Sequence, residues 1–231
     1  MRRGFLLLCL FWLLPAVSPG TLAGNLDDAN AAADRVHSNG KTALMVAAKN
    51  GDRERIKTLI GEGADVNRAN KNGGTPIMYA VLSHDTETVS LLVRYGAEVN
   101  AVADNGWTAL MIASAKGYSD IARLLLEHGA KPDIADVYSW TPLMRAVYEQ
   151  RLQIVSLLVA QKSTRVNRIG ENGLTALHLA ALKGDQAIAQ VLLAAGADPA
   201  IRDDLGRTPL DFAKKNKDLQ MERLVRTAGE D

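Results

Sequence analysis

Hydrophobic residues along this chain fall into pairs of short blocks, and each block has helical spacing. In the block after Thr108, Leu110, Ala113 and Ser114 lie at positions i, i+3 and i+4, which share one helical face. The next block, residues 121–126, carries larger apolar side chains and is followed by Gly129. Glycine commonly supplies the left-handed residue that ends a helix. The pattern therefore predicts two short helices in succession.

The same pair of blocks recurs six times. Each copy starts with Thr, then Ala or Pro, then Leu or Ile, and the starting residues are Thr42, Thr75, Thr108, Thr141, Thr175 and Thr208. Thr caps a helix with its hydroxyl, and Pro suits the first helical turn. An Ala five residues after each Thr allows the helices to approach closely. One repeat cannot bury its own apolar face, so neighbouring repeats must complete the core.

Asn-Gly pairs precede four of these threonines, as Asn39-Gly40, Asn72-Gly73, Asn105-Gly106 and Asn172-Gly173. Asn-Gly is the strongest signal for a two-residue hairpin turn. We therefore expect a hairpin tip at each pair.

With these features the chain resembles the ankyrin repeat family. The best copy reads Gly173-Leu174-Thr175-Ala176-Leu177-His178-Leu179-Ala180-Ala181, followed by Gly196-Ala197-Asp198. The resemblance covers about residues 34–228 and implies an all-α repeat solenoid of about six repeats. Its ankyrin-type helix pairs would be antiparallel, with β-hairpin fingers joining successive repeats. The motif is specific for the fold and says little about function.

The chain divides into three expected segments. Residues 1–23 are typical of a signal peptide, because Arg2 and Arg3 precede a short apolar run and small residues end at Ala23, the expected cleavage site. An uncleaved membrane anchor is the alternative. Residues 24–36 are expected to form an N-terminal partial repeat or cap. The array would occupy residues 37–231, with repeats near 37–69, 70–102, 103–135, 136–169, 170–202 and 203–231.

Removal of residues 1–23 leaves 25 basic and 26 acidic residues and takes away Cys9, the one cysteine. This balance argues against a general nucleic-acid binder. A mature chain without cysteine suits an oxidising compartment, and it has no Asn-x-Ser/Thr site. We therefore expect a bacterial protein in the periplasm or secreted, without stable membrane insertion after cleavage.

The mature chain carries no motif of a catalytic or metal site. No two histidines share ligand spacing, carboxylates are scattered, and no phosphate-binding loop follows a strand. The resemblance assigns His178 a hydrogen-bonding role within the fold. We expect no enzyme activity, no cofactor and no metal, and an enzyme with a composite site between fingers remains the alternative.

Four methionines in the slot of His178 are expected to fill the core, rather than form a binding surface or an oxidant sink: Met45, Met78, Met111 and Met144.

In ankyrin-like proteins, finger residues and the exposed start of the inner-helix surface usually contact the partner. In this sequence aromatic and apolar side chains gather at those positions in repeats three to five, with candidate partner-binding residues Trp107, Tyr138, Trp140, Arg145, Tyr148, Leu174 and Leu182. Aromatic anchors of this kind dominate interface energetics. Lys41, Lys49, Arg207 and Lys215 would form a polar rim. The alternative is that Trp107 and Trp140 stack across adjacent fingers, and both roles can hold together.

Repeat four breaks several rules at once. Tyr138-Ser139 replaces Asn-Gly at the finger tip, Gln150 replaces the glycine between the helices, and residues 161–164 lack the usual helix-ending Gly. Each lost glycine costs about 1 kcal/mol if the backbone still requires positive φ. Local inconsistency is typical of functional sites, although neutral drift in a long array is the alternative.

These patterns predict a scaffold that binds another protein through its concave face. The resemblance suggests two bacterial settings, a periplasmic companion of an oxidative-stress enzyme or an immunity protein against a secreted toxin. An effector released toward a host cell is the alternative.

Overall fold

The computed structural model describes residues 40–229, so the predicted signal peptide and N-terminal cap lie outside the described residues. The first helix of each repeat, called the inner helix, is α2 (Ala43–Asn50), α4 (Pro76–Leu82), α6 (Ala109–Lys116), α8 (Pro142–Tyr148), α10 (Ala176–Lys183) or α12 (Pro209–Lys215). The second, outer helix is α3 (Arg53–Gly61), α5 (Thr86–Arg94), α7 (Ser119–Glu127), α9 (Leu152–Val159), α11 (Gln186–Ala194) or α13 (Leu219–Thr227).

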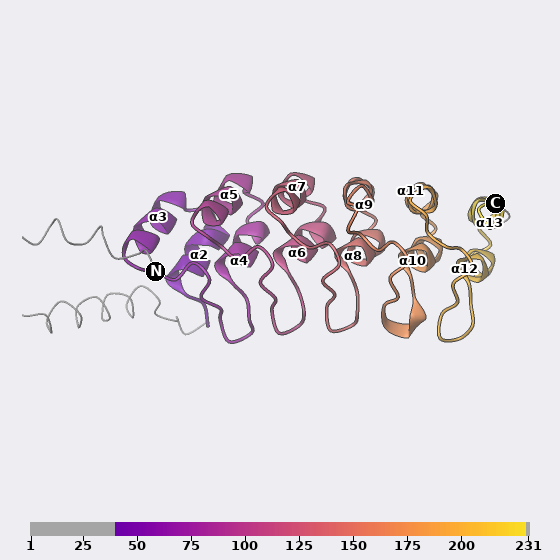
Figure 1. Cartoon of the computed structure of the whole chain (residues 1–231), viewed down its shortest axis with the longest axis horizontal. Coiled ribbons are helices and arrows are strands. Elements are labelled where there is room, and N and C mark those ends of the chain that lie inside the picture. Colours follow the sequence, from indigo (N-terminus) through magenta and orange to yellow (C-terminus); the bar gives the residue numbers. More distant parts are fainter. Residues whose placement is uncertain (1–39, 230–231) are drawn as a thin grey trace, which may run out of the picture.

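The helices form two parallel rows along an elongated molecule (Figure 1). Each inner helix packs on the inner helices of neighbouring repeats and on the outer helix of its own repeat. The loops that join successive repeats, called fingers and numbered by the repeat whose inner helix they precede, extend from the inner row on the side away from the outer row (Figure 1). Residues 40–229 contain no β-strand and no helix long and apolar enough to cross a membrane. The predicted all-α repeat solenoid is confirmed.

Local sequence explains where the helices begin and end. The hydroxyl of Thr108 accepts a hydrogen bond from the backbone N–H of Met111 at 3.2 Å, and Thr141 caps α8 in the same way. Four outer helices begin at an aspartate N-cap, namely Asp52, Asp85, Asp185 and Asp218. Four of the six repeats have glycine at positive φ after a helix, as Gly129 has after α7. These caps satisfy backbone groups that a short helix leaves unpaired.

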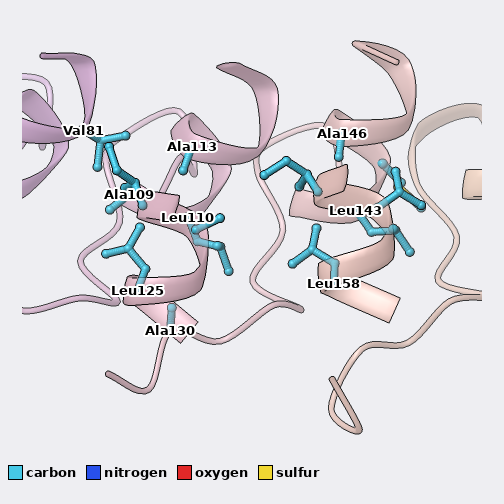
Figure 2. Close-up of a cluster of buried hydrophobic side chains, with 14 of the residues drawn as sticks. Val81, Ala109, Leu110, Ala113, Leu125, Ala130, Leu143, Ala146 and Leu158 are labelled. Atoms are coloured by element: carbon cyan, nitrogen blue, oxygen red, sulfur yellow. The ribbon is translucent and has the colours of Figure 1, made fainter. Parts of the chain in front are cut away.

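The core runs between the two rows and continues from repeat to repeat. Figure 2 shows Ala113 and Ala146 beside the larger side chains of Leu110, Leu125 and Leu143, all of which are buried. The small alanines let the inner helices approach, and the larger residues fill the space between the rows. The four methionines predicted to fill the core are buried, which confirms that prediction.

The finger turns differ from the two-residue hairpins expected at Asn-Gly. In finger two, the backbone N–H of Asn70 bonds to the carbonyl of Gly74 at 2.9 Å, which encloses three residues rather than two. Gly73 has a φ of 74°, whereas Asn72 is absent from the positive-φ region. A three-residue hairpin loop places a single left-handed residue at its end. The Asn-Gly signal thus located the turns but gave the wrong loop length.

Backbone hydrogen bonds join each finger to the next. The N–H of Val137 donates to the carbonyl of Asn105 at 3.2 Å, and that of Glu171 donates to Tyr138 at 3.0 Å. Equivalent bonds join fingers two and three and fingers five and six. Every finger from two to six is therefore held at a fixed distance from its neighbour.

The two missing glycines of repeat four are replaced without a change of backbone conformation. Ser139 and Gln150 have φ values of 58° and 55°. His84 and Lys217 occupy the Gln150 slot in repeats two and six, also at positive φ. Gln150 is therefore less exceptional than the sequence indicated, whereas Ser139 alone replaces glycine among the described finger turns.

The end of α9 uses a different cap. The hydroxyl of Thr164 donates to the carbonyl of Leu158 at 2.7 Å. At the equivalent helix end in repeat two, the backbone N–H of Ala97 donates to the carbonyl of Leu92 at 3.0 Å. Successive repeat threonines are 33 residues apart, except that Thr141 and Thr175 are 34 apart, so repeat four has one extra residue. The side-chain cap accommodates this residue without a left-handed glycine. This departure is satisfied locally and does not involve the fingers.

His178 links repeats five and six from a fully buried position in α10. Its Nδ1 accepts from the backbone N–H of Thr175 at 3.2 Å, so Nε2 carries the proton and donates to the carbonyl of Arg207 at 3.1 Å. The predicted hydrogen-bonding role is confirmed. Burial lowers the pKa of His178 below its usual value, although the Arg207 carbonyl and the charge of Asp203 act in the opposite direction.

We expect the stability of the mature chain to fall as the pH drops below about 6.5, the ordinary pKa of histidine. In that range the unfolded chain binds a proton at His178 that the folded chain excludes, so acid favours unfolding. Urea unfolding between pH 7.5 and 5.5 measures the slope. His178→Met, which installs the residue found in this slot in repeats one to four, removes this contribution. Identical slopes in the two proteins would contradict the assignment.

Candidate functional site

The candidate site is built on finger four, residues 136–140, and Asp136 organises it. One carboxylate oxygen of Asp136 accepts from the backbone N–H groups of Tyr138 and Trp140 at 2.9 and 3.0 Å. The other accepts from Nε of Arg145 at 3.0 Å and from its Nη2. The Asp136 side chain is 0% exposed and that of Arg145 is 19% exposed. This buried pair fixes the finger to α8.

Sequence reasoning missed Asp136. The same slot holds Asn70 in repeat two, whose Oδ1 accepts from the backbone N–H groups of Asn72 and Gly74. In repeat six it holds Asp203, which accepts from Leu205 and Arg207. A short polar residue five positions before the repeat threonine is therefore the signal that would have identified it.

Arg145 lies between the two candidate tryptophans. Its guanidinium carbon is 5.1 Å from the ring centroid of Trp107 and 4.6 Å from that of Trp140. The expected alternative, a direct stack of Trp107 on Trp140, is replaced by this cation–π bridge, and no ring pair joins the two indoles among the described contacts. Cation–π contacts with a partly buried guanidinium are worth about 1–2 kcal/mol, so the bridge orients both rings.

The aromatic array continues into repeat five. Trp140 meets Tyr148 edge to face, with ring centroids 5.3 Å apart, and Nζ of Lys183 lies 3.6 Å from the Tyr148 centroid. Gly170 lets finger five lie close to Trp140, because an added Cβ there would be 3.1 Å from Cδ1 of that ring. The array therefore spans the three consecutive repeats that carry the candidate residues.

These side chains border a groove of about 360 Å³ lined by Tyr138, Trp140, Arg145, Tyr148, Glu171, Leu174, Leu179 and Leu182. Six of the seven candidate residues line it, and Trp107 supports it through Arg145. Glu171 and Leu179 were not among the candidates. Hollows of about 450 and 480 Å³ elsewhere are lined mostly by loop residues or by charged residues, and no aromatic residue lines either. The aromatic lining, rather than the volume, distinguishes this groove.

Several apolar side chains of the groove are accessible to a partner. Tyr138 is 54% exposed and Leu182 is 40% exposed. Two of the predicted rim cations are engaged, because Lys41 lies over the Tyr79 ring and Arg207 pairs with Asp203. Lys49 and Lys215 are exposed, as a rim requires.

The groove has the chemistry of a binding surface. Among residues 40–229, no group of three or more His, Cys, Asp or Glu side chains is arranged to hold a metal ion. His178, the histidine nearest in sequence to the residues that line the groove, is buried and hydrogen-bonded within the fold. Aromatic rings that are accessible in part and held by cation–π contacts offer a preorganised apolar anchor site.

Comparison with known proteins agrees with this architecture. One family model, described as ankyrin repeats in three copies, matches residues 9–103 and 100–170, and a second, ankyrin repeats in many copies, matches residues 157–213. A solved ankyrin repeat domain from Acinetobacter baumannii AYE is 31% identical, with a TM-score of 0.75, over 80% of this chain and 97% of that chain.

A second solved structure is the complex of a predatory endopeptidase from Bdellovibrio bacteriovorus with an immunity protein. The matching chain of that complex is 28% identical, with a TM-score of 0.72, over 80% of this chain and 97% of that chain. Among curated proteins, the mitochondrial disaggregase of Rattus norvegicus is 35% identical over 77 residues, which are 32% of this chain and 11% of that protein. The ankyrin repeat domain-containing protein SOWAHD of Mus musculus is 42% identical over 60 residues, 26% of this chain and 18% of that protein. The matches to these two proteins span less than a fifth of their length.

Proposed function

Because the chain belongs to the ankyrin repeat family, whose domains are generally non-catalytic interaction modules, we propose that it binds a partner protein through the groove of repeats three to five. The observation that carries the proposal is the aromatic array of half-buried Trp140 and exposed Tyr148 beside Leu182. Interface energy concentrates in such aromatic anchors when they sit in well-packed pockets.

The proposed setting is the bacterial periplasm or the exterior of the cell, in keeping with the signal-peptide pattern of residues 1–23. Within that setting we propose an immunity role, in which the chain holds a secreted hydrolase inactive. The support is the chain of similar fold in the complex of an endopeptidase with an immunity protein. A scaffold suits this role because inhibition by occupation requires no turnover.

Site-specific photocrosslinking tests the binding surface. A photoreactive amino acid replaces Leu182 in the groove or, as the matched control, Ala187 on the exposed face of outer helix α11. Each protein is produced with its signal segment and irradiated in intact cells. We expect one crosslinked protein from position 182 and none of the same mass from position 187. Equal labelling from both positions, or labelling from position 187 alone, would contradict the proposal.

We expect Trp140→Ala to weaken binding of the purified crosslinked protein about 30-fold, the effect of losing roughly 2 kcal/mol at an interface anchor. Titration calorimetry measures the affinity. Leu182→Asp, at an exposed position that leaves the core intact, provides a second variant if Trp140→Ala alters the fold. The immunity role predicts that the crosslinked protein is a hydrolase and that one molar equivalent of this chain inhibits it. A retained affinity in both variants would place the interface elsewhere.

A further inference from the structure

A positive charge lies beside the groove at the end of α10. Nζ of Lys183 rests over the Tyr148 ring, 3.6 Å from its centroid. An ammonium group has three N–H donors, and the ring face attracts it without neutralising its charge. Within residues 40–229, no carboxylate lies within 4.0 Å of Lys183. Its position is therefore fixed by the ring while its charge stays available.

A negative charge lines the same groove from finger five. The backbone N–H of Glu171 donates to the carbonyl of Tyr138 at 3.0 Å, which holds this residue against finger four. Its side chain is exposed and has no cationic partner within the described part of the chain. The finger side of the groove thus presents an unpaired carboxylate.

The third charge at the groove is already compensated. Arg145 is paired with the buried Asp136 and lies between Trp107 and Trp140. The groove therefore combines an apolar lining with two uncompensated charges, the Glu171 carboxylate from finger five and the Lys183 ammonium over the Tyr148 ring at the end of α10. Charge complementarity across an interface sets the register and excludes wrong partners.

From this arrangement, and resting on the proposed function, we infer the chemistry of the partner. The groove binds a protein segment whose apolar side chain contacts Trp140 and Leu182 and whose flanking residues carry a carboxylate for Lys183 and a cation for Glu171. Nucleic acid does not fit, because its phosphates would meet Glu171 and only one uncompensated cation. An anionic membrane surface does not fit either, since it attracts clusters of basic residues.

Selection from a random peptide library displayed on phage tests the inference. The purified mature chain, Lys183→Glu, Glu171→Lys and Lys116→Glu serve as targets. Lys116 occupies the same slot as Lys183 two repeats earlier but, unlike Lys183, does not lie over an aromatic ring of the groove, so it is the matched charge control. Selected peptides are then synthesised, and their affinities are measured for each variant and for Trp140→Ala and Leu182→Asp.

We expect the wild-type chain and Lys116→Glu to select an apolar residue with Asp or Glu on one side and Lys or Arg on the other. Lys183→Glu should replace the selected acid with a base and weaken the wild-type peptide about tenfold, because attraction becomes repulsion. Glu171→Lys should replace the selected base at the other position with an acid. If the selected peptides depend on Trp140 and Leu182 but carry the same charges whichever target selected them, this inference is overturned and the proposed function stands. If no selected peptide depends on either groove residue, both fail.

Discussion

Asp136→Ala is expected to lower the free energy of unfolding by about 3–5 kcal/mol, the usual consequence of removing one partner of a buried ion pair. The change leaves the Arg145 guanidinium, 19% exposed, without its counterion. It also removes the acceptor for the backbone N–H groups of Tyr138 and Trp140. Urea denaturation followed by circular dichroism measures the loss.

Tryptophan fluorescence reports separately on the groove. Apart from Trp12 in the predicted signal peptide, the two tryptophans of the chain are Trp107 and Trp140. Both contact Arg145, so their emission is expected to shift to the red in Asp136→Ala as the rings become more exposed. A shifted emission with unchanged circular dichroism would show that the groove is altered while the array remains folded.

Two further variants separate the charge from the hydrogen bonds. Asp136→Asn keeps an oxygen for the two backbone donors, as Asn70 does in repeat two, so its loss should be smaller. Adding Arg145→Leu to Asp136→Ala removes the unpaired guanidinium and is expected to recover part of the stability. Leu179 already fills this slot in repeat five. If Asp136→Ala stays within 1 kcal/mol of the wild type, the pair has no structural role.

Gly106→Ala is expected to destabilise the chain by about 2–4 kcal/mol, from backbone strain of about 1 kcal/mol and from crowding of about 1–3 kcal/mol. The added Cβ would lie 2.4 Å from Cα of Asp136 and 2.8 Å from the backbone N of Val137. Because these are backbone atoms, finger four must move as a whole. The movement would break the bond from Val137 to Asn105 and displace Trp140.

Gly206→Ala is the matched control for Gly106→Ala. Gly206 occupies the same slot in finger six at a φ of 73°, but an added Cβ there has nothing within 4 Å. It should therefore show only the backbone strain of about 1 kcal/mol. The free energies of unfolding of the two variants are compared with one common slope of free energy against urea concentration. Equal losses would mean that close contact between fingers three and four does not constrain the groove.

The fold could be predicted because its signals are local. Thr108 and Thr141 cap their own helices, Gly129 ends its own helix, and the 33-residue spacing brings like positions into register. The turn length at Asn72-Gly73 was wrong because it depends on which backbone groups pair, and the same dipeptide is compatible with both loops.

The candidate site could be predicted in part. Six residues chosen by slot line one groove, because equivalent slots in adjacent repeats lie side by side. The roles within the groove were not evident. Asp136 acts through Arg145, nine residues along the chain, and Lys183 acts through Tyr148 from the previous repeat. Such pairs depend on side-chain directions that slot comparison does not contain. Whether a partner occupies the groove stays a prediction.

The contacts from Trp107 through Arg145, Trp140 and Tyr148 to Lys183 also have a mechanical consequence. An array of repeats bends by small rotations between neighbours. The contacts among these five side chains join three repeats at a distance from the helix–helix contacts. A rotation of one repeat against the next therefore displaces these side chains more than it displaces the core beneath them. Repeats three to five therefore resist changes of curvature through these side chains in addition to the backbone bonds between fingers. A partner that binds there meets a segment whose shape changes little on binding.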